Sequence, residues 1–158
     1  MSFSDREFRN SLGQFATGVC LVSAKDEEGI PHAVTVNSFS SVSLSPPLVL
    51  WSIQKEANTY DLFLSANNFA ISILSASQQE LSVAYAQKDG HVLEPQHYQT
   101  GSNGAPLIDG AIAAFECTLE RVLEGGDHTI LLGRVTAVHD APGQEPLVFF
   151  AGKYRSLS

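Results

Sequence analysis

Small neutral polar side chains crowd one short stretch of the chain, residues 32–45 (HAVTVNSFSSVSLS). Alternate residues of a strand face opposite sides, so this stretch predicts an apolar core face and a polar face. The apolar face would hold Val34, Val36, Val42 and Leu44, and the polar face Thr35, Asn37, Ser41, Ser43 and Ser45. The polar face carries no charged side chain and suits a ligand with many hydrogen-bonding groups. A plain Ser/Thr-rich edge strand would give the same pattern, and the pattern alone does not decide between the two.

The other reactive residue types give no motif for metal or nucleophile chemistry. The five histidines form neither HxH nor HxxxH, so a metal site is not expected. Cys20 and Cys117 lie in strand-like runs without a neighbouring histidine or basic residue, which favours buried structural thiols. The chain has no GxSxG elbow, no GxGxxG and no Walker loop, so neither a Rossmann dinucleotide module nor a P-loop is indicated.

The elements that must position the polar stretch are mainly strands. A capping box, Ser4 with Glu7, opens an N-terminal helix that ends by Gly18, and Ser77 with Glu80 predicts a second box. A short helix is expected over 58–64 and a long surface loop over 88–110, which a compact domain often uses for function. Strands are expected over 19–24, 33–36, 39–44, 48–53, 69–74, 114–123, 129–138 and 147–150. About six to eight strands with hairpin-type connections predict a mainly β fold, an antiparallel barrel with a few short helices.

Composition limits the class of protein. The 158 residues predict a single domain over 1–158, and 44% hydrophobic against 16% charged residues excludes a disordered chain. The net charge of −8 argues against nucleic-acid binding. No apolar run reaches the roughly 18 residues of a membrane span, and residues 1–15 lack a signal-peptide pattern. Two distant cysteines without CxxC predict a cytoplasmic protein.

Several motifs along the chain resemble the flavin reductase-like family in the same order, from the first helix to Tyr154. Single pieces are weak signals, but the ordered set is specific. They are Phe15-Ala16-Thr17-Gly18-Val19, Pro31-His32-Ala33-Val34-Thr35, Asn37-Ser38-Phe39, Ser41-Val42-Ser43-Leu44-x-Pro46-Pro47-Leu48-Val49-Leu50, Asn68-Phe69-Ala70-Ile71-x-Ile73-Leu74, Gly126-Asp127-His128-Thr129, Gly133-Arg134-Val135 and Phe149-Phe150-x-Gly152-Lys153-Tyr154.

The resemblance implies an FMN-binding split barrel that is usually a homodimer. It also implies NADH- or NADPH-dependent reduction of FMN or FAD, and many members supply reduced flavin to a partner monooxygenase. It does not choose between the two flavins or the two nicotinamides, nor between bound flavin and flavin as a substrate. Because a flavin brings its own hydride chemistry, such a reductase needs no catalytic triad or metal.

The resemblance also carries over site residues by position. The isoalloxazine edge would be lined by Thr35, Val36, Asn37 and Ser38, and the ribityl phosphate held by Ser52, Asn58 and Thr59. The nicotinamide would lie beside His128, the candidate catalytic residue, in a pocket bordered by Lys153, Tyr154 and Arg155. Members often have a basic or second hydroxyl residue near positions 55–59, where this chain reads KEANT, so the phosphate contacts depart from the family pattern.

Two other functions fit the same resemblance. A flavin-binding oxidoreductase of this fold could pass electrons to another acceptor, such as a ferric chelate. A flavin carrier would bind the cofactor without oxidising a nicotinamide, and it would have no use for His128 or Tyr154 beside a second pocket.

Overall fold

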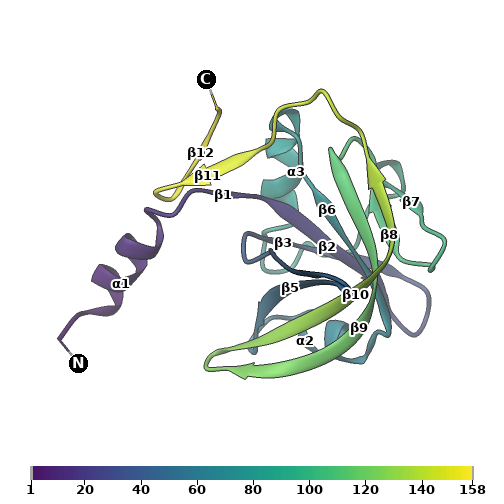
Figure 1. The fold of residues 1–158 in the computed structure, drawn as a ribbon, viewed down its shortest axis with the longest axis horizontal. Coiled ribbons are helices and arrows are strands. Elements are labelled where there is room, and N and C mark those ends of the chain that lie inside the picture. The colour runs from purple at the N-terminus through teal and green to yellow at the C-terminus, as the bar shows by residue number, and fades with distance from the viewer. Residues whose placement is uncertain (1, 158) are drawn as a thin grey trace.

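The computed structural model describes residues 2–157, and its main body is one seven-stranded antiparallel sheet. The strand order is β3-β2-β6-β9-β10-β5-β4. The bounds are β2 (Cys20–Lys25), β3 (Pro31–Val36), β4 (Ser40–Leu44), β5 (Pro47–Gln54), β6 (Asn68–Ile73), β9 (Ala113–Gly125) and β10 (His128–Asp140). Figure 1 shows β9 and β10 as the long hairpin of this sheet.

The mainly β, antiparallel fold with a few short helices is confirmed, but the sheet is not a closed barrel. Within residues 2–157, β3 and β4 are its two edges and no strand pairing joins them. The β3 edge is covered by the chain that follows α3: His91 O accepts the Ala33 N–H (2.8 Å), and Pro31 O accepts the Leu93 N–H (2.9 Å). This segment therefore lies against the strand that carries Thr35.

Short elements surround the main sheet. The helices are α1 (Asp5–Leu12), α2 (Tyr60–Ser65) and α3 (Gln79–Ala84), with 3-10 turns at Ala76–Gln78 and Pro95–His97. Two strands, β7 (Tyr98–Thr100) and β8 (Pro106–Ile108), form a separate hairpin. A third sheet is made by β1 (Thr17–Gly18), β11 (Val148–Phe150) and β12 (Lys153–Arg155). Figure 1 shows α1 and this sheet extending away from the main body, and we call them together the arm.

Two apolar clusters hold in place the elements that surround the pocket. Trp51 of β5 packs edge-on against Phe63 of α2, with 5.0 Å between the ring centroids, and also contacts Phe69 of β6. Gly133 makes room for this packing, because a Cβ there would lie 2.7 Å from Phe69 Cζ. The second cluster includes Tyr85, directly after α3. The clusters hold β5, α2 and the end of α3 in place around a common opening.

The predicted core face of residues 32–45 is only half right. Val34 and Val36 pack against the core, whereas Val42 is 47% exposed and Leu44 97% exposed. The prediction was wrong for β4, because β3 ends at Val36 and the chain turns before β4 begins at Ser40 at the opposite edge of the sheet, so the alternation of β3 does not carry over into β4. The pairing of β4 with β5 also shifts register between Ser41 and Ser43, so the alternation does not continue through β4.

The second predicted capping box was also wrong. Ser75 and Gln78 form it instead, with Gln78 Oε1 accepting the Ser75 N–H (2.9 Å), and α3 begins only at Gln79. The first box is confirmed, because the Ser4 hydroxyl accepts the Glu7 N–H and Glu7 Oε2 accepts the Ser4 N–H. The predicted loop over 88–110 contains β7 and β8, which were missed because three-residue strands show no readable alternation.

Cys20 and Cys117 are buried and unpaired, as predicted. Burial raises the pKa of each thiol to about 12, so neither is a reactive thiolate at neutral pH. Within the described chain, the helices are too short or too polar to span a bilayer.

Candidate functional site

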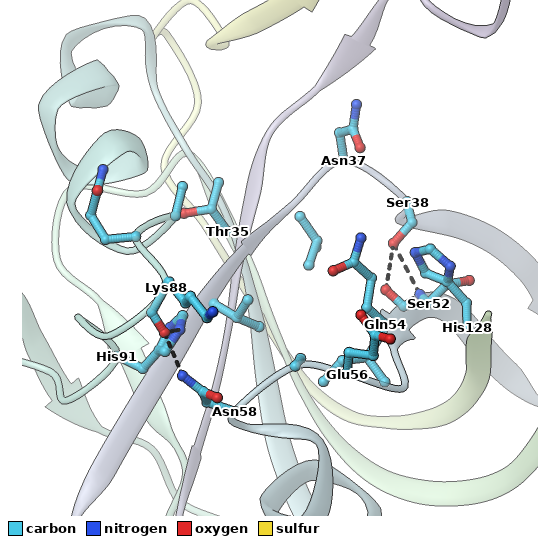
Figure 2. A pocket seen from close by; sticks show the side chains of 16 residues that line it. Thr35, Asn37, Ser38, Ser52, Gln54, Glu56, Asn58, Lys88, His91 and His128 are labelled. Atoms are coloured by element: carbon cyan, nitrogen blue, oxygen red, sulfur yellow. Dashed lines mark hydrogen bonds between the residues drawn. The ribbon is translucent and has the colours of Figure 1, made fainter. Parts of the chain in front are cut away.

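One pocket of about 590 Å³ opens where β3, β5 and the segment after α3 meet (Figure 2). This volume lies in the range of small-molecule and cofactor sites. The lining comes from β3 and the turn after it, the end of β5, the chain leading into α2, residues 86–91 and the first residue of β10. The lining residues are Val34, Thr35, Val36, Asn37, Ser38, Ser52, Ile53, Gln54, Glu56, Ala57, Asn58, Ala86, Gln87, Lys88, His91 and His128.

Sheet register brings the two ends of the polar lining together. His128 of β10 pairs with Gln54 of β5, two residues beyond Ser52. Across the sheet edge, Ser38 donates its hydroxyl to Ser52 O (3.2 Å) and accepts the Ser52 N–H (2.9 Å). Figure 2 shows this serine pair beside His128. The Ser38 hydroxyl therefore anchors the turn after β3 to β5.

The polar side chains of the pocket divide into engaged and unengaged groups. Thr35 donates its hydroxyl to Ser82 O (2.7 Å), at the last turn of α3. In contrast, the Asn37 amide, the Ser52 hydroxyl and the Gln54 amide make no side-chain hydrogen bond to any residue of 2–157. Donors and acceptors without a protein partner, beside the apolar walls of Val36 and neighbouring residues, are what a heteroaromatic ligand requires.

His128 lies at the pocket rim and is oriented by its neighbour. Its Nδ1 lies 2.7 Å from Asp127 Oδ1, an exposed carboxylate. The hydrogen bond from His128, helped by its charge, holds the pKa of Asp127 below its ordinary value. Because a carboxylate only accepts, Nδ1 carries the proton and Nε2 is left to accept a hydrogen bond from a ligand. Protonated, the same Nε2 would donate to a carbonyl or a phosphate.

The pocket brings together seven of the sequence-predicted residues: Thr35, Val36, Asn37, Ser38, Ser52, Asn58 and His128. Asn58 points its amide at residues 88 and 89, donating to Lys88 O (2.7 Å) and Asp89 Oδ1 (3.3 Å). Thr59 does not line the pocket. It is only 4% exposed, it precedes α2, and its hydroxyl has no partner within residues 2–157.

The three predicted residues of the C-terminal end also lie outside the pocket lining, on β12 of the arm. The Tyr154 and Ser82 hydroxyls share a hydrogen bond of 2.6 Å in which either can be the donor. The backbone carbonyl of Ser82 accepts the hydrogen bond from the Thr35 hydroxyl. The Arg155 guanidinium lies 5.6 Å from the centre of the Phe150 ring. Tyr154 thus touches the site through Ser82, and Lys153 and Arg155 have no contact with it in the described chain.

Sequence reasoning missed several lining residues, namely Gln54, Glu56, Gln87, Lys88 and His91. Three of these follow α3, where the chain has no periodicity from which a face could be assigned. The available signal is the unusual length of the predicted loop over 88–110, because long loops in compact domains often serve function. Gln54 could have been found from the strand of Ser52, because alternate residues share a face.

Comparison with known proteins gives a consistent result over almost the whole chain. The model of the family described as "Flavin reductase like domain" matches residues 12–158. The FMN reductase (NADH) SmoA of Agrobacterium fabrum is 42% identical over 155 residues, covering 98% of this chain and 87% of that protein. The reductase subunit HsaB of a flavin-dependent monooxygenase, from Rhodococcus jostii, is 32% identical and covers 96% and 77%.

The solved structures agree with the sequence relatives. The NADH:FAD oxidoreductase SgcE6 of Streptomyces globisporus, in complex with NAD and FAD fragments, superposes with a TM-score of 0.92. It is 38% identical, and the match covers 98% of this chain and 93% of that one. With the family model matching residues 12–158 and relatives above 30% identity along nearly its full length, the chain belongs to the flavin reductase-like family.

Proposed function

We propose that this protein is an NADH-dependent flavin reductase that uses the described pocket for both flavin and nicotinamide. The observation that carries the proposal is the set of unpartnered polar groups beside His128, in a pocket of about 590 Å³. Names of relatives support it: SmoA is an FMN reductase using NADH, and the SgcE6 structure holds NAD and FAD fragments. Rates measured with NADH and with NADPH, and with FMN and with FAD, decide which nicotinamide and which flavin the protein prefers.

The lining fits a flavin in chemical terms. Val34, Val36, Ile53 and Ala57 offer apolar contact for a flat ring system, and Asn37 and the Ser52 hydroxyl offer hydrogen bonds to its polar edge. A bound flavin supplies the hydride-accepting centre, so the protein has to bind, orient and exclude rather than perform acid–base chemistry. The absence of a general-base motif in the sequence is consistent with this division of work.

His128 is the residue proposed to position the nicotinamide. With Nδ1 committed to Asp127, its Nε2 can accept a hydrogen bond from a carboxamide at the pocket rim. Holding two reactants in the correct orientation removes much of the barrier to transfer between them. The role of His128 is therefore placement of the second substrate, not proton transfer.

Steady-state NADH oxidation with and without FMN, FAD and riboflavin tests the proposal. We expect NADH oxidation that depends on flavin, either from flavin that co-purifies or from added flavin. Protein that binds flavin and leaves NADH unoxidised would favour the carrier, and the proposal would fail. Oxidation that requires a ferric chelate as the acceptor would favour the alternative electron-transfer function.

We further propose that the protein is a homodimer. Helix α1 has no buried residue, and Phe8, Leu12 and Phe15 of the arm are 52%, 58% and 79% exposed. Apolar side chains gathered on a projecting arm are typical of a contact surface, and a second copy, with exposed Leu44 of its own, offers a matching one. Lys153, Tyr154 and Arg155 lie on the same arm, so any ligand contact from Lys153 or Arg155 depends on such pairing.

Sedimentation at micromolar concentration tests the dimer. The proposal expects twice the 17.0 kDa mass of one chain for wild type and a monomer for Phe8→Glu. A wild-type monomer that still binds flavin would contradict it.

HsaB is named as a reductase subunit of a monooxygenase, which supports a separate flavin-dependent monooxygenase as the consumer of reduced flavin. The cytoplasmic location expected from the two unpaired cysteines stays a prediction.

A further inference from the structure

Thr35 lines the pocket with its hydrogen-bond donors already committed to the end of α3. Its hydroxyl donates to Ser82 O (2.7 Å), and its backbone N–H donates to Tyr85 O (3.2 Å). Because the hydroxyl proton is spent on Ser82, Thr35 Oγ1 is left to accept a hydrogen bond from a ligand. Figure 2 shows Thr35 on the side of the pocket opposite Ser52 and His128. The placement of α3 therefore sets one wall of the pocket.

α3 is too short to be stable without contacts to the rest of the protein. It has six residues, Gln79–Ala84, whereas isolated helices shorter than about 12 residues are marginal in water. Leu81 and Tyr85 pack it against the second apolar cluster. Ser82 is fully buried, and a buried hydroxyl without a hydrogen-bond partner costs stability. The partner of the Ser82 hydroxyl is therefore part of what holds α3 in place.

The partner of the Ser82 hydroxyl comes from the arm. Tyr154 of β12 shares a hydrogen bond of 2.6 Å with it, and the Tyr154 ring packs against the second apolar cluster. The ring also lies edge-on to Phe149 of β11, with 5.3 Å between the ring centroids. Phe149 in turn pairs with Thr17 of β1. A continuous series of contacts thus runs from the three strands of the arm through Tyr154 and Ser82 to Thr35.

We propose that Tyr154 is a positioning residue of the flavin pocket: through the Ser82 hydroxyl it holds α3, and α3 holds Thr35 in place for the flavin. The inference rests on the proposed function and deepens it, because it makes flavin affinity depend on the arm. The family resemblance implied a place for Tyr154 at the border of a nicotinamide pocket. In the structure its hydroxyl is engaged by Ser82 of the same chain, and the residue lies outside the pocket lining. Tyr154 therefore acts on the flavin through α3 and needs no contact with either ligand.

The first test is a double-mutant cycle on the affinity for FMN, measured by fluorescence titration. Tyr154→Phe removes the hydroxyl and keeps the ring that packs against the second apolar cluster. Loss of its one hydrogen bond should lower FMN affinity about three- to tenfold. Thr35→Val should lower it about tenfold, because it removes both the bond to Ser82 O and the acceptor offered to the ligand. Because both substitutions break the same series of contacts, the double variant should lose clearly less than the product of the two single losses.

Two conservative variants are the controls. Tyr98→Phe removes a hydroxyl from another tyrosine of the second apolar cluster, one that lies outside the pocket lining and whose hydroxyl makes no hydrogen bond within residues 2–157. It should bind FMN as wild type does. Thr35→Ser keeps the hydroxyl that donates to Ser82 O, and it should retain most of the FMN affinity that Thr35→Val loses. Urea unfolding of every variant separates a loss of affinity from a loss of folded protein.

The second test uses the reciprocity of the coupling. If the arm strengthens flavin binding, bound flavin must stabilise the contact with the arm by the same free energy. Backbone amides of β11 and β12 should therefore exchange more slowly with deuterium when FMN is bound, and this slowing should be lost in Tyr154→Phe. Slowing of the same size in wild type and Tyr154→Phe would overturn the inference, because the contact between Tyr154 and Ser82 would then not carry it.

Other results of the titrations would also overturn it. Losses that multiply in the double variant would show that Tyr154 does not act through Thr35. Wild-type FMN affinity in Tyr154→Phe with a raised KM for NADH would make Tyr154 a direct contact of the nicotinamide. Wild type that reduces flavin, with unchanged FMN affinity in Tyr154→Phe, would leave the proposed function standing and end this inference. Wild type that binds no flavin would end both.

Discussion

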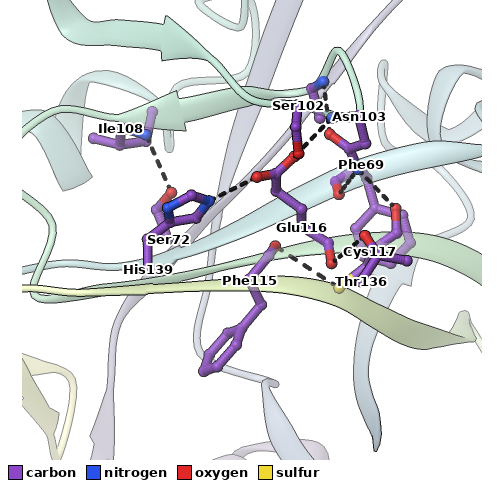
Figure 3. Close-up of polar contacts among 11 residues, drawn as sticks. Phe69, Ser72, Ser102, Asn103, Ile108, Phe115, Glu116, Cys117, Thr136 and His139 are labelled. Carbon is purple, nitrogen blue, oxygen red and sulfur yellow. Dashed lines mark hydrogen bonds and ion pairs between the residues drawn. The ribbon is translucent and has the colours of Figure 1, made fainter.

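Two polar regions of this protein use the same sheet in opposite ways. In the pocket, Asn37 and the Ser52 hydroxyl have no side-chain partner within residues 2–157. On β9, the carboxylate of Glu116 is fully buried, and both of its oxygens have hydrogen-bond partners. Figure 3 shows Oε1 accepting from the Ser102 hydroxyl (2.9 Å) and the Asn103 N–H (2.7 Å), and Oε2 facing His139 Nε2 at 2.6 Å.

The difference separates structural polar groups from functional ones. We call Glu116, Ser102, Asn103 and His139 the Glu116 cluster. It ties the chain between β7 and β8 to the main sheet, and Gly101 has to lack a side chain there because a Cβ would lie 2.8 Å from the Glu116 carboxyl. A satisfied buried cluster stabilises the fold, whereas unsatisfied groups at an open pocket are available to a ligand. Substitutions in the Glu116 cluster should therefore lower the free energy of unfolding and leave flavin affinity unchanged. Substitutions in the pocket should lower flavin affinity and leave the free energy of unfolding unchanged.

The largest effect is expected from Glu116→Ala. Removing a buried carboxylate leaves three donors without their acceptor, so the free energy of unfolding should fall by about 3 kcal/mol or more. Urea unfolding measures it, and flavin affinity of the folded fraction should be unchanged. Glu120→Ala is the control, since Glu120 pairs with Arg134 on the surface and should cost less than about 1 kcal/mol. Equal losses in the two variants would erase the contrast between buried and exposed carboxylates.

Acid should weaken the Glu116 cluster without a mutation. Burial alone would raise the pKa of Glu116, but hydrogen bonds from His139, Asn103 and Ser102 hold it below its ordinary value. A lowered pKa in the folded state means that the stabilisation is present above the carboxyl's ordinary pKa, about 4.3 in an unfolded chain, and is lost as pH falls through the folded-state value. The stability gap between wild type and Glu116→Gln should shrink below about pH 4. A gap that stays constant down to acid unfolding would show that the carboxylate charge contributes nothing.

Asn37→Ala tests the other region. Loss of an amide that pairs only with the ligand should weaken flavin binding by about 1–3 kcal/mol and leave the unfolding free energy within about 0.5 kcal/mol. Fluorescence titration and urea unfolding of the same preparation give both numbers. The opposite signature, lower stability with unchanged affinity, would move Asn37 into the structural class.

A smaller effect, confined to the nicotinamide, is expected from His128→Ala. The variant should lose about tenfold in kcat/KM for NADH, with the flavin dissociation constant unchanged. Its melting temperature should stay close to wild type, because the pair with exposed Asp127 contributes little to stability. Unchanged NADH kinetics with a lowered melting temperature would make His128 a residue of the β9–β10 turn only.

The chain reveals its strands well and its long-range neighbours poorly. Alternation alone places Thr35 and Asn37 on a polar face, because residues along a strand keep a fixed geometry, whereas Val36 and Ser38 enter the predicted site only through the family resemblance. The same alternation predicts a core position for Leu44, and this is wrong. Alternation says nothing about which edge of the sheet a strand occupies, and β4 lies at an edge where Leu44 is exposed. Lys88 and His91 reach the pocket only through hydrogen bonds to Ala33 and Asn58, more than 25 residues away, and no local pattern encodes such contacts.

Glu116 shows the same limit from the opposite side. In the sequence it is one acidic residue within a strand-like run, a position that usually faces solvent. Its burial depends on Ser102, Asn103 and His139 arriving from other elements. The family resemblance supplied the pocket residues of β3 and β5, but it did not indicate which polar groups serve the fold.

The central claim, that NADH reduces a flavin held by the unpartnered polar groups of the pocket, is tested most directly by mixing the protein with FMN and NADH without oxygen. The flavin absorbance should bleach rapidly with wild type and with Glu120→Ala. The rate with Asn37→Ala at subsaturating FMN should fall about tenfold or more, as the weaker binding predicts. Bleaching at the wild-type rate in Asn37→Ala, or flavin that stays oxidised with wild type, would contradict the claim.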